Sequence, residues 1–189
     1  MPSRDIVTHW MLEEIGVPFD NIQLSLDDQE HKTPEYLAIN PMGRMPALVH
    51  HGTVVTETAA IVTYLAETFP DSHLSVPPGT PERGEFLRWL FFAPVTAEPS
   101  VMWVALGKVE TETDYLPFAN INDVADKIEP AITGKAYLVD ERFTAADLML
   151  GATYSGGRNC CQFCLSDLKS NAIGVLCLQG QPGKPINLL

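Results

Sequence analysis

Cysteine thiols are the most reactive groups in this 189-residue sequence, and all four lie in its last fifth: Cys160, Cys161, Cys164 and Cys177. Cys161 and Cys164 have the spacing of many metal and redox sites. However, no histidine follows this pair, and only Cys177 offers a further thiolate toward the four ligands of a structural zinc site. We therefore interpret the cysteines as reduced thiols and predict no metal; a zinc site is the alternative.

Pro46 opens an apolar stretch, PALVH, that otherwise has the character of a β-strand. Proline has no N–H to donate to a strand ladder, so it is confined to the first residue of a strand, to an edge or to a bulge. We infer that this position requires a fixed backbone more than it requires a hydrogen bond.

The spacing of apolar residues predicts the elements around Pro46. Residues 4–15 have helical spacing and end at Gly16, a typical C-cap residue. Alternating apolar residues over 22–26 predict a half-buried strand, and PALVH and TVV on either side of HG predict a hairpin. The polar loop DDQEHKTPEY is expected to lead to a short helical turn before Pro46, and a helix is expected over 58–69. The elements then follow in the order α-β-α-β-β-α.

A Pro- and Gly-rich stretch, PDSHLSVPPGTPERG, predicts a domain boundary. We expect a first domain over residues 1–70, a linker over 71–82 and an all-helical domain over 83–154. Residues 155–189 hold a single acidic residue and every cysteine, have no helical period, and are expected to form an irregular tail.

Three helical segments are expected in the second domain. One covers residues 85–106 and is kinked or divided at Pro94 and Pro99, and another covers about 122–132. The third begins in RFTAADLML, where Thr144 and Asp147 have a spacing close to that of a capping box, and ends near residue 152.

Charge and hydropathy exclude several classes of partner. The net charge of −12 repels phosphate backbones and anionic lipid, so no nucleic-acid or membrane-surface binding is expected. No apolar run approaches the roughly 20 residues that span a bilayer, and MPSRDIVTHW has no apolar core of a secretory signal. The predicted location is the cytoplasm.

Four segments together resemble the soluble glutathione transferase family, in particular its bacterial, theta-like members: WMLEEIGVPFD, EHKTPEYLAINPMGRMPALV, TVVTETAAIVTYLAETFP and YLVDERFTAADL. They cover about residues 3–152 in the family's order. The resemblance implies an α/β thioredoxin-like N-terminal domain and an all-α C-terminal domain. It also implies an enzyme that conjugates the glutathione thiolate to hydrophobic electrophiles, and a homodimer.

The resemblance also assigns glutathione contacts. A cis bond between Met45 and Pro46 would expose the Met45 main chain to the cysteinyl part of glutathione, whereas a trans proline starting a strand is the alternative. At the predicted helix start, Thr58 and the helix dipole would bind the γ-glutamyl carboxylate, and Glu57 would bind its ammonium. A helix cap at Thr58 is the simpler reading, and both can hold.

The remaining site residues also follow from the resemblance. His31 and Lys32, with Arg44 nearby, would reach the glycine carboxylate of glutathione, unless they form only a solvated loop. Ser3 is the candidate catalytic residue, since its hydroxyl would lower the thiol pKa by a hydrogen bond; a helix cap is the alternative. Apolar candidates for the second substrate are Trp10, Phe91, Phe92, Met102 and Trp103.

The sequence departs from the family pattern at both ends. Family members begin with a strand before the serine, which lies between the strands here predicted at 22–26 and 47–50, whereas this sequence starts at Met1. The tail differs in composition, which suggests a shifted reading frame or an altered terminus. The alternative function is therefore a non-catalytic, transferase-like binding or scaffold protein.

Overall fold

The computed structural model describes residues 4–107, 120–139 and 141–160, which divide into two compact units on either side of residues 73 and 74. Each unit has its own buried core. None of the helices in these ranges is long and apolar enough to cross a membrane.

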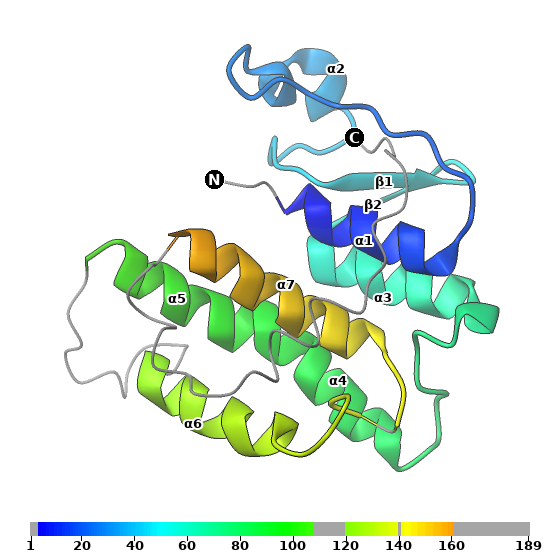
Figure 1. Cartoon of the computed structure of the whole chain (residues 1–189). Helices are drawn as coiled ribbons and strands as arrows, with labels where there is room; N and C mark the ends of the chain where they lie inside the picture. The colour runs from blue at the N-terminus through cyan, green and yellow to red at the C-terminus, as the bar shows by residue number, and fades with distance from the viewer. Residues whose placement is uncertain (1–3, 108–119, 140, 161–189) are drawn as a thin grey trace. The chain divides into compact units, whose positions relative to one another are not determined.

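The first unit combines helices with a small sheet (Figure 1). Its elements are α1 (Asp5–Ile15), α2 (Pro34–Leu37), β1 (Ala47–His50), β2 (Thr53–Thr56) and α3 (Thr58–Thr68). α1 packs against α3, and α3 packs against the hairpin. The prediction that Gly16 ends α1 is confirmed, because its φ of 76° is left-handed and its N–H donates to the Leu12 carbonyl at 3.0 Å.

The predicted hairpin is confirmed as well. β1 and β2 pair antiparallel, with Ala47 opposite Thr56 and His50 opposite Thr53. His51 and Gly52 form the two-residue turn, and both have positive φ, as a type I′ hairpin requires. This register places the chain just before β1 beside the chain just after β2.

The predicted strand over residues 22–26 is wrong. The sheet of the described residues has two strands, β1 and β2, and residues 22–26 lie in neither. Ile22 and Leu26 are 52% and 50% exposed. A strand exists only through its ladder partner, and no described strand lies beside this segment.

The second unit is helical among its described residues. It contains α4 (Glu82–Phe92), α5 (Glu98–Ala105), α6 (Ile121–Ile132) and α7 (Ala145–Cys160), and α4 packs against α7. The expected division near Pro94 is confirmed: a π-helical segment, Ala93–Ala97, joins α4 to α5. The core of the second unit includes Phe86, Trp89, Leu90, Ile128 and Leu148, each at most 1% exposed.

Two details of α7 differ from the sequence expectation. Residues 145–160 are helical, so the predicted end near residue 152 is wrong; once a helix is nucleated, each added residue gains a hydrogen bond, which offsets the poor propensity of its glycines. The predicted capping box is confirmed in one half, because the Asp147 Oδ2 accepts from the Thr144 N–H at 2.8 Å. The other half differs: the Thr144 hydroxyl, an acceptor in that motif, donates to the same Oδ2 at 2.8 Å.

Candidate functional site

The chain before β1 is positioned by two buried side chains from the turn that includes α2. The Tyr36 hydroxyl and the Asn40 side-chain amide both donate to the Arg44 carbonyl, at 2.6 and 2.7 Å. Burial raises the pKa of Tyr36, against a smaller opposing effect of Asn40, so the phenol keeps its proton and remains a donor. These contacts fix the backbone directly before Met45.

Met45 and Pro46 follow this anchored carbonyl, and the peptide bond between them is cis. Pro46 is buried and Met45 is half-buried. No hydrogen bond joins the main-chain N–H or carbonyl of Met45 to another described residue. The amide and carbonyl of Met45 are therefore available to an extended ligand.

The N-terminus of α3 lies at the same end of the hairpin as Met45 and Pro46. Because Ala47 pairs with Thr56, Pro46 comes beside Glu57. Glu57 occupies the N-cap position with a φ of 69° and makes no side-chain cap, while its carbonyl accepts from the Ile61 N–H at 2.9 Å. The reading of Thr58 as the helix cap is wrong, since Thr58 is the first helical residue.

This uncapped helix end has the electrostatics of an anion site. The first N–H groups of α3 have no side-chain cap, and the aligned peptide dipoles add a partial positive charge there. Glu57 is exposed and Thr58 is half-buried, so that a hydroxyl donor and a carboxylate acceptor flank the same point. An anionic group next to an ammonium group fits this pairing.

Lys32 brings a cation to the chain before Arg44. Its Nζ donates to the Gly43 carbonyl at 2.8 Å and to the Met42 carbonyl at 3.2 Å. Gly43 has a φ of 56°, and a Cβ placed there would lie 2.6 Å from the Lys32 Nζ and 2.9 Å from the His31 carbonyl. Only glycine fits this packing without a shift.

The other two cation candidates lie in the same loop region. The Nδ1 atom of His31 is buried and has no hydrogen-bond partner in the structure, and Arg44 is exposed. Lys32 uses two of its three ammonium donors on carbonyls, which leaves one for a ligand. The structure thus brings the predicted residues His31, Lys32 and Arg44 near the residues around Pro46.

Other predicted residues fall elsewhere. Ser3 lies outside the described residues. Trp10 belongs to α1, where its Nε1 donates to the Glu14 carboxylate at 2.9 Å, and the remaining apolar candidates for the second substrate belong to the second unit. No group of three metal-binding side chains occurs among the described residues, and Cys161, Cys164 and Cys177 lie outside them.

Sequence reasoning missed Tyr36, Asn40 and Gly43. Their only signal is local: an aromatic residue stands ten positions, an amide six positions and a glycine three positions before Pro46. Which main-chain carbonyl a tyrosine or an asparagine will bind depends on the loop conformation, which the sequence pattern does not specify.

Comparisons with known proteins agree with this architecture. Residues 1–67 match the family described as Glutathione S-transferase, N-terminal domain. Glutathione S-transferase F9 of Arabidopsis thaliana is 35% identical over 157 residues, which cover 78% of this chain and 72% of that protein. Two other curated relatives are covered over 64% and 73% of their own lengths, so the chain spans about two thirds of them.

Solved structures show the same fold. A glutathione transferase from Methylococcus capsulatus str. Bath matches with a TM-score of 0.74 and 28% identity, over 95% of this chain and 90% of that one. The glutathione transferase URE2P6 of Phanerochaete chrysosporium, solved in complex with oxidized glutathione, matches with a TM-score of 0.69 and 26% identity, over 94% and 84%.

The fold is therefore a thioredoxin-like α/β domain followed by a helical domain. With the match to the Arabidopsis protein, this chain belongs to the glutathione S-transferase family.

Proposed function

We propose that this chain binds glutathione on its first unit and transfers the glutathione thiolate to hydrophobic electrophiles. The observation that carries the proposal is the register of the hairpin, in which Ala47 pairs with Thr56. It sets the main chain of Met45 beside the uncapped N-terminus of α3. The main chain of Met45 offers strand-like hydrogen bonds, and the N-terminus of α3 binds an anion.

Each part of glutathione has a matching group in this arrangement. The γ-glutamyl carboxylate binds to the N–H groups at the α3 N-terminus and to the Thr58 hydroxyl. The ammonium of the γ-glutamyl residue binds to the Glu57 carboxylate. The cysteinyl main chain pairs with Met45. Lys32 and Arg44, with His31 beside them, receive the glycine carboxylate, which suits a ligand with two carboxylates in an otherwise strongly acidic protein.

The chemical step requires a thiolate, which is the nucleophilic form of glutathione. We assign Ser3 to hold it: the hydroxyl donates a hydrogen bond to the sulfur and lowers the pKa of the thiol. The thiol loses its proton to solvent water, the resulting thiolate forms a bond to the electrophilic carbon, and the leaving group departs with the electron pair. From the family resemblance we further propose a homodimer that acts in detoxification, and its proposed location is the cytoplasm.

Retention on immobilised glutathione, followed by conjugation of a chromogenic electrophile, tests this function. The proposal predicts retention and turnover for the wild type, and a Ser3→Ala variant that is retained but whose turnover falls at least tenfold. A folded wild-type chain that passes through the column without retention contradicts the proposal.

A second candidate is a glutathione-binding protein without catalysis. The specific observation in its favour is the small sheet of the first unit, in which residues 22–26 form no strand. Retention of the wild type without turnover of any electrophile, and no difference between wild type and Ser3→Ala, would favour this second function.

A further inference from the structure

Tyr36 and Asn40 are polar residues that the fold buries almost completely, at 3% and 4% exposed. The N–H of Asn40 donates to the Tyr36 carbonyl at 2.8 Å, so the turn after α2 holds the two residues next to each other. Burial of a polar side chain is costly unless its groups are hydrogen-bonded. The bonds that satisfy these two side chains therefore identify the main-chain group that they hold in place.

Both side chains donate to one acceptor, the Arg44 carbonyl. A carbonyl oxygen has two lone pairs, and the Tyr36 hydroxyl and the Asn40 amide, at 2.6 and 2.7 Å, supply one donor for each. A further contact orients the amide, because the Asn40 Oδ1 accepts from the Met42 N–H at 3.1 Å while the amide nitrogen faces Arg44. The Arg44 carbonyl thus cannot turn without losing a buried hydrogen bond.

The direction of this carbonyl also sets the direction of the Met45 N–H. The peptide bond between Arg44 and Met45 is trans, because the cis bond of the described residues is the one between Met45 and Pro46. In a trans peptide group the C=O and the N–H lie in one plane and point in opposite directions. The two donors on the Arg44 carbonyl therefore aim the Met45 N–H, although neither donor forms a hydrogen bond with Met45.

The carbonyls that precede Met45 are occupied as well. Lys32 donates to those of Met42 and Gly43, so that the three successive carbonyls of residues 42, 43 and 44 all accept bonds from side chains. The Met45 N–H, in contrast, has no partner among the described residues. In strand-like pairing two opposite residues exchange both N–H···O bonds, so the acceptor for this N–H is the cysteinyl carbonyl of glutathione.

We propose that Tyr36 and Asn40 are positioning residues that make the site select γ-glutamyl peptides over γ-glutamyl amines. They aim the Met45 N–H at the carbonyl of the residue that follows the γ-glutamyl group. A γ-glutamyl amine has no carbonyl at this place and leaves the N–H unpaired. The inference rests on the proposed function, because it takes glutathione as the ligand of the Met45 main chain.

Calorimetric titration with two further thiol ligands tests this selection. The ethylamide of γ-glutamylcysteine keeps the cysteinyl carbonyl, whereas γ-glutamylcysteamine lacks it. Both ligands keep the γ-glutamyl group and the thiol, and both lack the glycine carboxylate, so a difference between them is independent of Lys32. The wild type is expected to bind the ethylamide about tenfold more tightly than γ-glutamylcysteamine.

Tyr36→Phe removes one donor and leaves the Asn40 donor in place, so the chain is expected to fold. Its affinity for the ethylamide and for glutathione should fall about threefold to tenfold, because one donor instead of two holds the peptide group. Its affinity for γ-glutamylcysteamine should stay the same, because this ligand makes no bond to the Met45 N–H. A general distortion of the site would weaken all three ligands alike.

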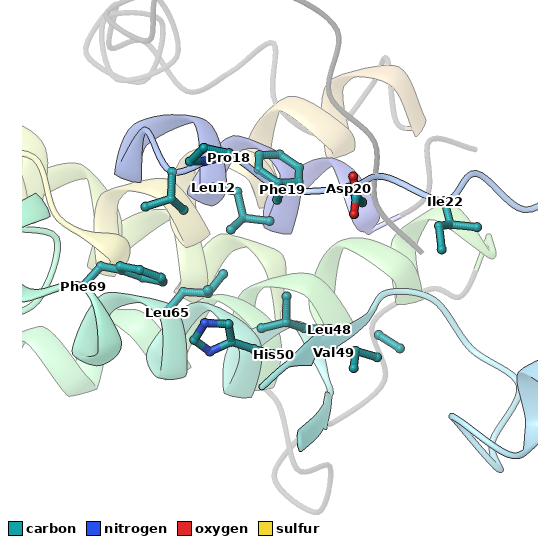
Figure 2. Close-up of a pocket in the computed structure, with 12 residues that line it drawn as sticks. Leu12, Pro18, Phe19, Asp20, Ile22, Leu48, Val49, His50, Leu65 and Phe69 are labelled. Atoms are coloured by element: carbon teal, nitrogen blue, oxygen red, sulfur yellow. The ribbon is translucent and has the colours of Figure 1, made fainter. Parts of the chain in front are cut away.

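Tyr64→Phe is the matched control. The Tyr64 hydroxyl also makes a side-chain hydrogen bond in the first unit, with the Nδ1 of His50 at 2.9 Å. His50 lies at the opposite end of β1 from Pro46 and packs beside Phe69, with ring centroids 5.8 Å apart (Figure 2). The same loss of one hydroxyl is therefore expected to leave the affinity for all three ligands unchanged.

Urea denaturation of each variant establishes that the titrated protein is folded. Three outcomes overturn the inference while the wild type still binds glutathione. The wild type binds the ethylamide and γ-glutamylcysteamine equally, Tyr36→Phe binds every ligand as tightly as the wild type, or Tyr36→Phe loses affinity for both test ligands by the same factor. A folded wild type that binds none of the three ligands overturns the proposed function, and the inference with it.

Discussion

The N-termini of α3 and α7 are built in opposite ways. At α7 the Asp147 carboxylate accepts from the Thr144 N–H and hydroxyl and from the Leu138 N–H, the last at 2.7 Å, and both Asp147 and Thr144 are fully buried. At α3 the N-cap residue Glu57 is exposed, has positive φ and makes no side-chain cap. The first terminus is completed by the protein, and the second is left for a ligand.

This difference separates a structural role from a binding role. A buried terminus without partners would cost about 1–3 kcal/mol for each unsatisfied group, so α7 supplies its own acceptor. An exposed terminus is solvated by water and can exchange that water for an anion. Substitutions at α7 should therefore change stability, and substitutions at α3 should change affinity.

The largest effect is expected at α7. Asp147→Ala leaves the buried N–H groups of Leu138 and Thr144 without their acceptor, so we expect a loss of about 3–5 kcal/mol in the free energy of unfolding, measured by urea denaturation. Asp123→Ala, in the exposed first turn of α6, is the control and should cost less than about 1 kcal/mol. Similar losses in the two variants would show that the buried acceptor is unimportant.

The second largest effect is expected on glutathione affinity at the α3 N-terminus. Glu57→Gln removes the charge assigned to the glutathione ammonium, so we expect a tenfold to hundredfold weaker Kd, from about 1.5–3 kcal/mol for a hydrogen bond to a charged group. The unfolding midpoint should stay the same. Glu67→Gln, at the other end of α3, is the control, and a Glu57→Gln protein that binds as tightly as this control would refute the assignment.

A substitution at Gly43 is expected to change both the stability of the fold and the affinity for glutathione. Gly43→Ala brings a Cβ to 2.6 Å from the Lys32 Nζ, and should displace the ammonium and weaken glutathione binding about threefold to tenfold. Gly52→Ala has the same left-handed backbone but no atom within 4 Å of the new Cβ. It should show only the strain of about 1 kcal/mol, with unchanged affinity. Equal affinities in calorimetric titrations of the two variants would remove Lys32 from the site.

The smallest effect is a pH dependence at α7. Burial raises the pKa of Asp147 above its ordinary value of 3.8, against the opposing hydrogen bonds from Leu138 and Thr144. The folded state therefore binds the proton more tightly than the unfolded state. Its contribution to stability is complete below pH 3.8 and is lost as the pH rises through the raised pKa.

This contribution can be isolated by difference. The free energy of unfolding is measured between pH 3 and 7 for the wild type and for Asp147→Asn, which does not titrate. The wild type should lose stability relative to the variant as the pH rises above 3.8 and through the raised pKa of Asp147. A relative gain would mean that the hydrogen bonds outweigh burial.

Features that depend on short-range backbone preferences could be predicted from the sequence, whereas features that depend on contacts between distant segments could not. The Gly16 cap, the His51–Gly52 turn and the helix beginning at Thr58 follow from short-range backbone preferences, and the sequence predicted all three. The strand at residues 22–26 was predicted from alternation, but a ladder depends on a neighbour that the local pattern does not reveal.

The candidate site divides in the same way. Glu57, Thr58, Met45 and Pro46 were identified from the family resemblance, and the hairpin register places them together. The supporting contacts from Tyr36 and Asn40 to the Arg44 carbonyl were not predicted, because they depend on how a loop folds back on itself.

Isothermal titration of the wild-type chain with glutathione and with cysteinylglycine tests the central claim most directly. Cysteinylglycine lacks the γ-glutamyl group assigned to Glu57 and the α3 N-terminus, but keeps the thiol and the glycine carboxylate. The account predicts saturable heat with glutathione and at least a hundredfold weaker binding of cysteinylglycine. Equal affinity for the two ligands, or no binding of glutathione by a folded chain, would contradict it.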